Sequence, residues 1–154
     1  MPRNKEFDPT RALDQAMHLF WRQGYYATSM DDLVAALHVQ RYGIYAVFTS
    51  KHDLFLAALD RYLLTIVSDL LAQVEQPGAG VDEIRAYFGQ LVMIAHSPAG
   101  EIGCLMCNSA TELAPHNPDV AAKVEGYVQR LTTAFRNALQ NAQGRRDLDG
   151  SLDL

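Results

Sequence analysis

Several features are scarce or missing in this sequence, and each absence excludes a class of protein. None of its 154 residues belongs to an apolar run near the roughly 20 residues that a membrane-spanning helix needs. The N-terminal residues 1–11 also lack the apolar segment of a secretory signal, which predicts a cytoplasmic protein. Glycine and proline are sparse, at 10 and 6 residues, so the composition is not that of a disordered or low-complexity chain.

Cysteine and net charge are also limited. The two cysteines, Cys104 and Cys107, have a Cys-x-x-Cys spacing, which in a cytoplasmic chain favours thiols over a structural disulfide. The net charge of −5 argues against a generally basic nucleic-acid-coating protein. However, residues 1–51 carry a net charge of +1 and the remainder −6. This asymmetry suits a protein that contacts an anion with its N-terminal part.

What the sequence does contain is helical periodicity along its whole length. Apolar residues make up 49% of the chain and recur at helical spacing, so an all-α fold is predicted. The expected helices cover residues 9–22, 30–37, 40–47, 51–76, 81–96, 102–114 and 118–143. Asp8 is a suitable N-cap for the first helix, Ser29 with Asp32 resembles a capping box, and Thr49 or Ser50 is expected to cap the fourth.

Residues 30–47 predict a helix-turn-helix. The second helix, at 40–47, is too short to be stable alone and must be held by the first. We expect Val39, Ile44 and Phe48 to face inward, which leaves the other face free to enter a DNA major groove. That outward face carries Gln40, Arg41, Tyr42, Gly43 and Tyr45.

The residue types on this face suit DNA. Glutamine reads adenine bidentately and arginine reads guanine, while Tyr45 and Lys51 suit phosphate oxygens. Three other readings stay open at this point. The first is an ordinary helical hairpin with a polar surface, and the second is an interaction domain that no longer binds DNA. The third is an enzyme in which Glu112, His96 and His116 perform acid–base catalysis. No nucleophile elbow or phosphate loop supports catalysis.

Two segments, "ALDQAMHLFWRQGYYATSMDDLVAALHV" and "QRYGIYAVFTSKHDLFLAALDRY", and the spacing between them carry a resemblance to a known family. Through them, residues 9–62 resemble the DNA-binding head of the TetR family of bacterial transcription repressors. The residues at family motif positions are Gly24, Thr28, Ser29, Val39, Tyr45, Phe48, Lys51 and Leu54. The DNA-contacting residues expected from the outward face and the resemblance together are Thr28, Ser29, Gln40, Arg41, Tyr42, Gly43, Tyr45 and Lys51. His38 departs from the family, which usually has a glycine with positive φ in this turn.

The resemblance also implies the organisation of the chain. It predicts a helix-turn-helix DNA-binding domain at 1–52 and a helical effector-binding and dimerisation domain at 53–143. Residues 144–154 are polar and lack an apolar stripe, so we expect a disordered tail there. The implied function is a ligand-responsive repressor that binds a palindromic operator as a homodimer, with no cofactor and no metal. Residues 118–142 carry a broad apolar stripe that must be buried against something, so we expect the dimer to form there. Because the chain is shorter at its C-terminus than is usual in the family, we expect a weaker dimer.

The effector of such a protein cannot be read from the sequence. Candidate effector-contacting residues are Tyr62, Tyr87 and Met93, although plain core packing is the more common role for any one such residue. The segment "GCLMCNSATEL" resembles a subgroup in which some members sense electrophiles through a cysteine. Cys104 and Cys107 lie on one helix face, so redox or electrophile sensing is the alternative function. Two further readings remain, namely small apolar core residues and a metal site with His96 or His116.

Overall fold

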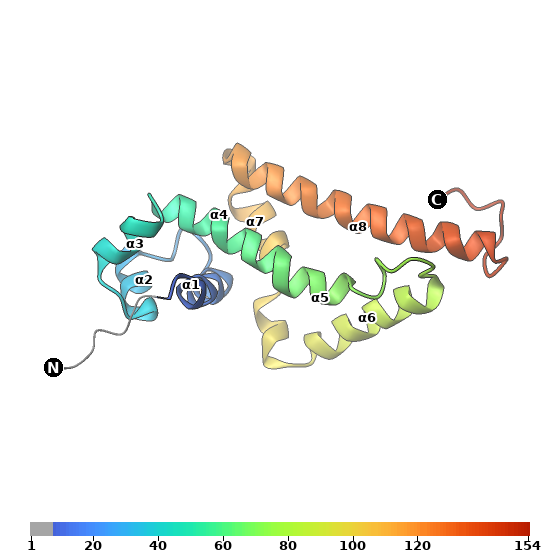
Figure 1. The fold of residues 1–154 in the computed structure, drawn as a ribbon, viewed down its shortest axis with the longest axis horizontal. Helices are drawn as coiled ribbons and strands as arrows, with labels where there is room; N and C mark the ends of the chain where they lie inside the picture. The colour runs from blue at the N-terminus through green and yellow to red at the C-terminus, as the bar shows by residue number, and fades with distance from the viewer. Residues whose placement is uncertain (1–7) are drawn as a thin grey trace. The chain divides into compact units, whose positions relative to one another are not determined.

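The computed structural model describes residues 8–154, and these residues form two compact units (Figure 1). The first unit contains the described residues up to Tyr62 together with Cys104–Ala121, and the second contains Leu63–Gly103 with Ala122–Leu154. Helices and turns account for both units, and no strand occurs among residues 8–154. The all-α prediction is therefore confirmed. None of the described helices combines the length and the apolar character needed to cross a membrane.

The first unit begins with α1 (Pro9–Gln23). The Asp8 carboxylate accepts hydrogen bonds from the backbone N–H groups of Thr10 and Arg11, so the predicted N-cap is confirmed. Gly24 ends the helix with a φ of 81°, a conformation that disfavours any residue with a Cβ.

α2 (Met30–Leu37) and α3 (Arg41–Val47) form the predicted helix-turn-helix, and Figure 1 shows them beside α1 at the start of α4 (Lys51–Tyr62). The capping box of Ser29 and Asp32 is present. His38 occupies the left-handed region, with a φ of 53°, which confirms that this turn requires a positive φ.

The core of the first unit joins α1 to α4. Phe20 and Phe55 are buried and pack edge to face, with ring centroids 5.0 Å apart. Ile44 is the buried residue of α3, whereas Val39 and Phe48 are half-buried, as expected for the inward face. Ser50 caps α4 by accepting a hydrogen bond from the Asp53 backbone N–H, which decides between the two predicted caps.

The segment predicted as one helix at 102–114 is interrupted. A 3₁₀ turn, η2 (Pro98–Ile102), ends at Gly103, and α7 (Leu105–Glu112) starts anew with Cys104 at its N-cap. A second 3₁₀ turn, η3 (Ala114–His116), follows α7. Gly103 has a φ of 66°, which breaks the helical path.

The expected boundary at 52/53 also differs from the division that the structure shows. α4 up to Tyr62 and residues 104–121 belong to the same unit as the helix-turn-helix. The physical reason is a set of contacts between segments distant in sequence, of which hydrogen bonds from the Tyr25 and Tyr26 backbone to Glu112 are the clearest.

In the second unit, the helix expected to run to residue 76 contains a π-helical turn, η1 (Leu63–Val67), and then α5 (Ser68–Leu71). The Ser68 hydroxyl and the Arg130 guanidinium both donate to the Leu63 carbonyl, which gives this carbonyl partners outside the regular helix. α6 (Val81–Ala95) and α8 (Pro118–Gly144, in this unit from Ala122) complete the unit.

The sequence pattern predicted disorder after α8, and residues 145–154 there contain turns and bends but no further helix. The Gln143 side chain donates to the carbonyls of Asp149 and Leu152, and Arg145 donates to the carbonyl of Gly78. Hydrogen bonds to backbone carbonyls do not depend on an apolar pattern, so hydrophobic periodicity could not predict them.

Candidate nucleic-acid interface

α3 presents a polar and aromatic face to solvent. Gln40, Arg41, Tyr42 and Tyr45 are all exposed, with Tyr42 at 84%, while Ile44 on the opposite side is 1% exposed. An aromatic side chain this exposed has no packing role within the described residues. Gly43 is half-buried because Val39 lies beneath it, 4.0 Å from where a Cβ would stand.

Arg41 is not freely solvated on this face. Its guanidinium forms an ion pair with Asp31 of α2, with 2.6 Å between Nη2 and Oδ1. Both side chains are largely exposed, so the pair contributes little to stability. A base edge or phosphate that recruits Arg41 must therefore compete with Asp31.

Lys51, at the start of α4, lies against an aromatic ring. Its ammonium is 4.2 Å from the centroid of the Tyr25 ring, a cation–π contact. Burial lowers the pKa of Lys51, and the negative charges of Glu112 and Asp32 act in the opposite direction. This contact favours one position of the Lys51 ammonium among those that its flexible side chain can adopt.

The two residues before α2 have different roles. Ser29 is exposed, and its hydroxyl accepts a hydrogen bond from the Asp32 backbone N–H. The side-chain and backbone hydrogen bonds from Ser29 lower the pKa of Asp32. Thr28 is fully buried, and its hydroxyl donates to the Gly24 carbonyl at 2.6 Å. The Thr28 hydroxyl is therefore engaged within the protein, and contact of Thr28 with DNA stays a prediction.

Both cysteines lie near the start of α7 in the first unit. Cys104 is the N-cap residue, and the Tyr62 hydroxyl lies 3.6 Å from its sulfur. Partial burial raises the pKa of the Cys107 thiol, and the neighbouring Cys104 raises it further. Neither cysteine forms a disulfide.

The predicted effector residues are divided between the two units. Tyr62, Cys104 and Cys107 belong to the first unit, and Tyr87 and Met93 belong to the second. Tyr87 is buried and packs edge to face on Phe88 and Phe135, whereas Met93 is 76% exposed. Contact of these residues with an effector therefore stays a prediction.

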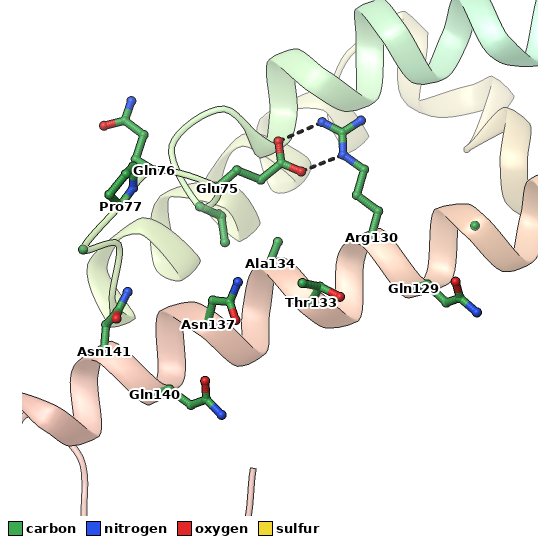
Figure 2. A pocket seen from close by; sticks show the side chains of 13 residues that line it. Glu75, Gln76, Pro77, Gln129, Arg130, Thr133, Ala134, Asn137, Gln140 and Asn141 are labelled. Atoms are coloured by element: carbon green, nitrogen blue, oxygen red, sulfur yellow. Dashed lines mark hydrogen bonds and ion pairs between the residues drawn. The ribbon is translucent and has the colours of Figure 1, made fainter.

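The second unit has a groove of about 700 Å³ between the 74–78 turn and α8 (Figure 2). Its lining residues are Val74, Glu75, Gln76, Pro77, Gly78, Gly126, Gln129, Arg130, Thr133, Ala134, Asn137, Gln140 and Asn141. Arg130 and Glu75 form a two-pronged ion pair at one end, at 2.6 and 2.8 Å. The corresponding sequence signal is a polar row along α8, in which Gln129, Thr133, Asn137 and then Gln140 or Asn141 follow one another at three- to four-residue spacing.

No cluster of three or more His, Cys, Asp or Glu side chains arranged to bind a metal ion occurs in residues 8–154. His96 instead places its Nδ1 2.7 Å from the Val92 carbonyl.

Comparison with known proteins connects this geometry to a family. The chain is 35% identical over 150 residues to the uncharacterized HTH-type transcriptional regulator YezE of Bacillus subtilis, a match that covers 97% of the chain and 77% of the relative. Residues 12–58 match the family description "Bacterial regulatory proteins, tetR family", and residues 80–154 match "Tetracyclin repressor-like, C-terminal domain". The chain belongs to the TetR family.

Two further relatives agree with this assignment. The HTH-type transcriptional repressor ComR of Escherichia coli is 35% identical over 153 residues, with 99% of this chain and 73% of the relative covered. Among solved structures, the TetR family regulator CifR in complex with operator DNA superimposes with a TM-score of 0.83 at 25% identity. That match covers 98% of this chain and 79% of CifR. This TetR family member is thus a DNA-binding transcription regulator and not an enzyme.

Proposed function

We propose that this protein is a ligand-responsive repressor that binds a palindromic DNA operator as a homodimer. The observation that carries the proposal is the exposed face of α3, where Gln40, Arg41 and Tyr42 stand over a buried Ile44. A rigid short helix with polar and aromatic groups outward suits direct readout in the major groove. CifR, with the same fold, was solved in complex with its operator DNA.

The proposed interface contains two kinds of contact, one with phosphates and one with base edges. Lys51, Tyr45 and the exposed Ser29 at the start of α2 are assigned to phosphates, and the N-terminal turn of α2 adds backbone N–H groups. Gln40, Arg41 and Tyr42, with Gly43 allowing close approach, are assigned to base edges. Thr28 is left out because its side chain is buried.

The dimer is proposed to form on α8, with help from α6. Phe88 of α6 stacks on Phe135 of α8 at 5.9 Å, and Phe88 and Val92 are both more than half exposed. Val128, 52% exposed, lies two turns before Phe135 on the same face of α8. An exposed apolar face of this kind is typical of an interface.

For the effector, we propose the groove beside α8. Its amide side chains and the Arg130–Glu75 pair offer donors and acceptors to a polar small molecule. Binding there would shift the protein toward a state with lower affinity for DNA.

Selection of DNA from a library of random duplexes tests the function. We expect the wild-type protein to enrich a palindromic sequence with half-sites roughly 34–36 Å apart. Lys51→Ala should then weaken binding to all sequences and reduce the salt dependence of affinity, whereas Gln40→Ala should relax one base preference by roughly 1–3 kcal/mol. Recovery of no preferred sequence would reject the proposal.

A second candidate function is thiol sensing, favoured by the position of Cys104 at the start of α7 next to Cys107 and the Tyr62 hydroxyl. Because the pKa of Cys107 is raised, less of it is thiolate at neutral pH, so Cys104 should be alkylated first. Labelling rates of Cys104→Ser and Cys107→Ser with iodoacetamide, measured together with DNA binding, test this. Equal labelling with unchanged DNA binding would assign both cysteines to packing.

A further inference from the structure

Glu112, at the end of α7, is bound to the backbone of a turn more than eighty residues earlier in the chain. Its Oε2 accepts a hydrogen bond from the Tyr25 N–H at 3.0 Å, and its Oε1 accepts one from the Tyr26 N–H at 2.9 Å. Hydrogen bonds from backbone donors to a carboxylate are among the stronger ones in proteins. One side chain thus fixes the connection between α1 and α2, which belongs to the helix-turn-helix.

The turn is shaped to receive this carboxylate. Gly24 has a φ of 81°, and a Cβ added there would lie 2.9 Å from both oxygens of Glu112. A larger residue at position 24 would therefore displace either the turn or the carboxylate.

The same turn positions a cation assigned to DNA. The residue that donates to Glu112, Tyr25, also carries the Lys51 ammonium over its ring at 4.2 Å. Tyr25 packs against Phe55 at 5.0 Å, so its ring has little freedom once its backbone is held. The negative charge of Glu112 is also close enough to Lys51 to raise the pKa of the Lys51 ammonium.

We propose that Glu112 is a positioning residue for DNA binding. It holds the Gly24–Tyr26 turn, the turn sets the place of the Tyr25 ring, and the ring sets the place of Lys51. The inference rests on the proposed contact of Lys51 with a phosphate. It makes α7, which begins at the cysteines, an element whose position controls affinity for DNA.

The sign of the effect separates positioning from simple electrostatics. A carboxylate near the DNA-facing surface repels phosphates, so loss of its charge alone would strengthen DNA binding. Loss of a residue that positions Lys51 would instead weaken DNA binding. Glu112→Gln removes the charge with little change of shape, and its amide nitrogen cannot accept a backbone hydrogen bond. Glu112→Asp keeps the charge but is one methylene shorter.

The experiment measures the affinity for the duplex that wild-type protein selects from a random library, across about 50–200 mM salt. We expect Glu112→Gln and Glu112→Asp each to bind about tenfold more weakly, with a salt slope smaller by about one phosphate contact. Glu101→Gln, an exposed glutamate in η2, makes the same charge change and should bind as wild type.

A double-mutant cycle tests whether Glu112 acts on DNA binding through Lys51. If Glu112 acts through Lys51, Glu112→Gln should change affinity little in a Lys51→Ala background. Unchanged or tighter binding by Glu112→Gln, or additive effects in the cycle, would overturn the inference. Loss of helical circular dichroism in both Glu112 variants would also overturn it, since Glu112 would then serve folding. If the wild-type protein selects no duplex, the proposed function fails first.

Discussion

At the scale of single residues, the interface contains a charge that competes with DNA. Arg41 is paired with Asp31, and both are exposed, so the pair is easily exchanged for another anion. Asp31→Asn should free Arg41 and remove a repulsive charge, and we expect DNA affinity to rise about three- to tenfold. Fluorescence anisotropy with the selected duplex measures this. Asp82→Asn is the matched control, because Asp82 lies in the first turn of α6 and pairs with Arg85 at 3.1 Å. Equal affinity of Asp31→Asn and wild type would show that the pair does not restrain Arg41.

A second residue-scale prediction concerns acid stability. The hydrogen bond and charge of Arg130 lower the pKa of Glu75 below its usual 4.5. A carboxyl group with a lowered folded-state pKa stabilises the fold above its unfolded pKa, and this stabilisation is lost as pH falls through the folded value. Glu75→Gln should therefore cost about 1 kcal/mol near pH 7, and the difference from wild type should shrink below about pH 4.5. Urea unfolding at several pH values measures it. A difference that stays constant down to pH 3 would contradict the assignment.

At the scale of elements, local sequence signals were enough to predict the helix-turn-helix. Asp8, Ser29 and Gly24 act within a few residues of their own helix ends, so capping and termination could be predicted from spacing. The hydrogen bonds from the Glu112 carboxylate to the 25–26 backbone depend on the path of the whole chain. Nothing in a single sequence pairs such distant positions, so the role of Glu112, the extent of the first unit and the groove beside α8 were not foreseen.

The recognition helix itself offers a test of element stability. Gly43 lies inside α3, and an added Cβ would meet nothing nearer than the Val39 Cβ at 4.0 Å. Gly43→Ala should therefore stabilise the protein by up to about 1 kcal/mol, through helix propensity. Gly24→Ala should destabilise it instead, because of the positive φ and the contact with Glu112. Thermal unfolding of both variants measures the difference. A lower melting temperature for Gly43→Ala would mean that α3 requires glycine for its own backbone.

At the scale of the whole molecule, the apolar pattern of α8 is divided between the inside and the outside of the protomer. Val120, Ala134 and Ala138 are buried within the described structure, so part of the stripe expected to dimerise already has partners. Val128 is 52% exposed, and with the exposed Phe88 and Val92 of α6 it leaves apolar surface that a second copy could cover. The proposed dimer therefore buries a smaller apolar area than the sequence pattern suggested. Because a smaller buried area gives a weaker dimer, its dissociation into monomers should be measurable.

The last prediction uses this difference in exposure. Val128→Glu places a charge at the centre of the proposed interface, where a twofold axis brings two copies close together. We expect it to shift the protein to monomer and to weaken operator binding at least tenfold, since a single head holds only one half-site. Leu152→Glu is the matched control, because Leu152 is also 52% exposed but lies in the turns after α8. Light scattering across a dilution series, with circular dichroism to show that both variants stay helical, gives the result. If Val128→Glu and wild type dissociate over the same concentration range, the dimer uses another surface. If wild type is monomeric at high micromolar concentration, two heads must assemble on DNA itself.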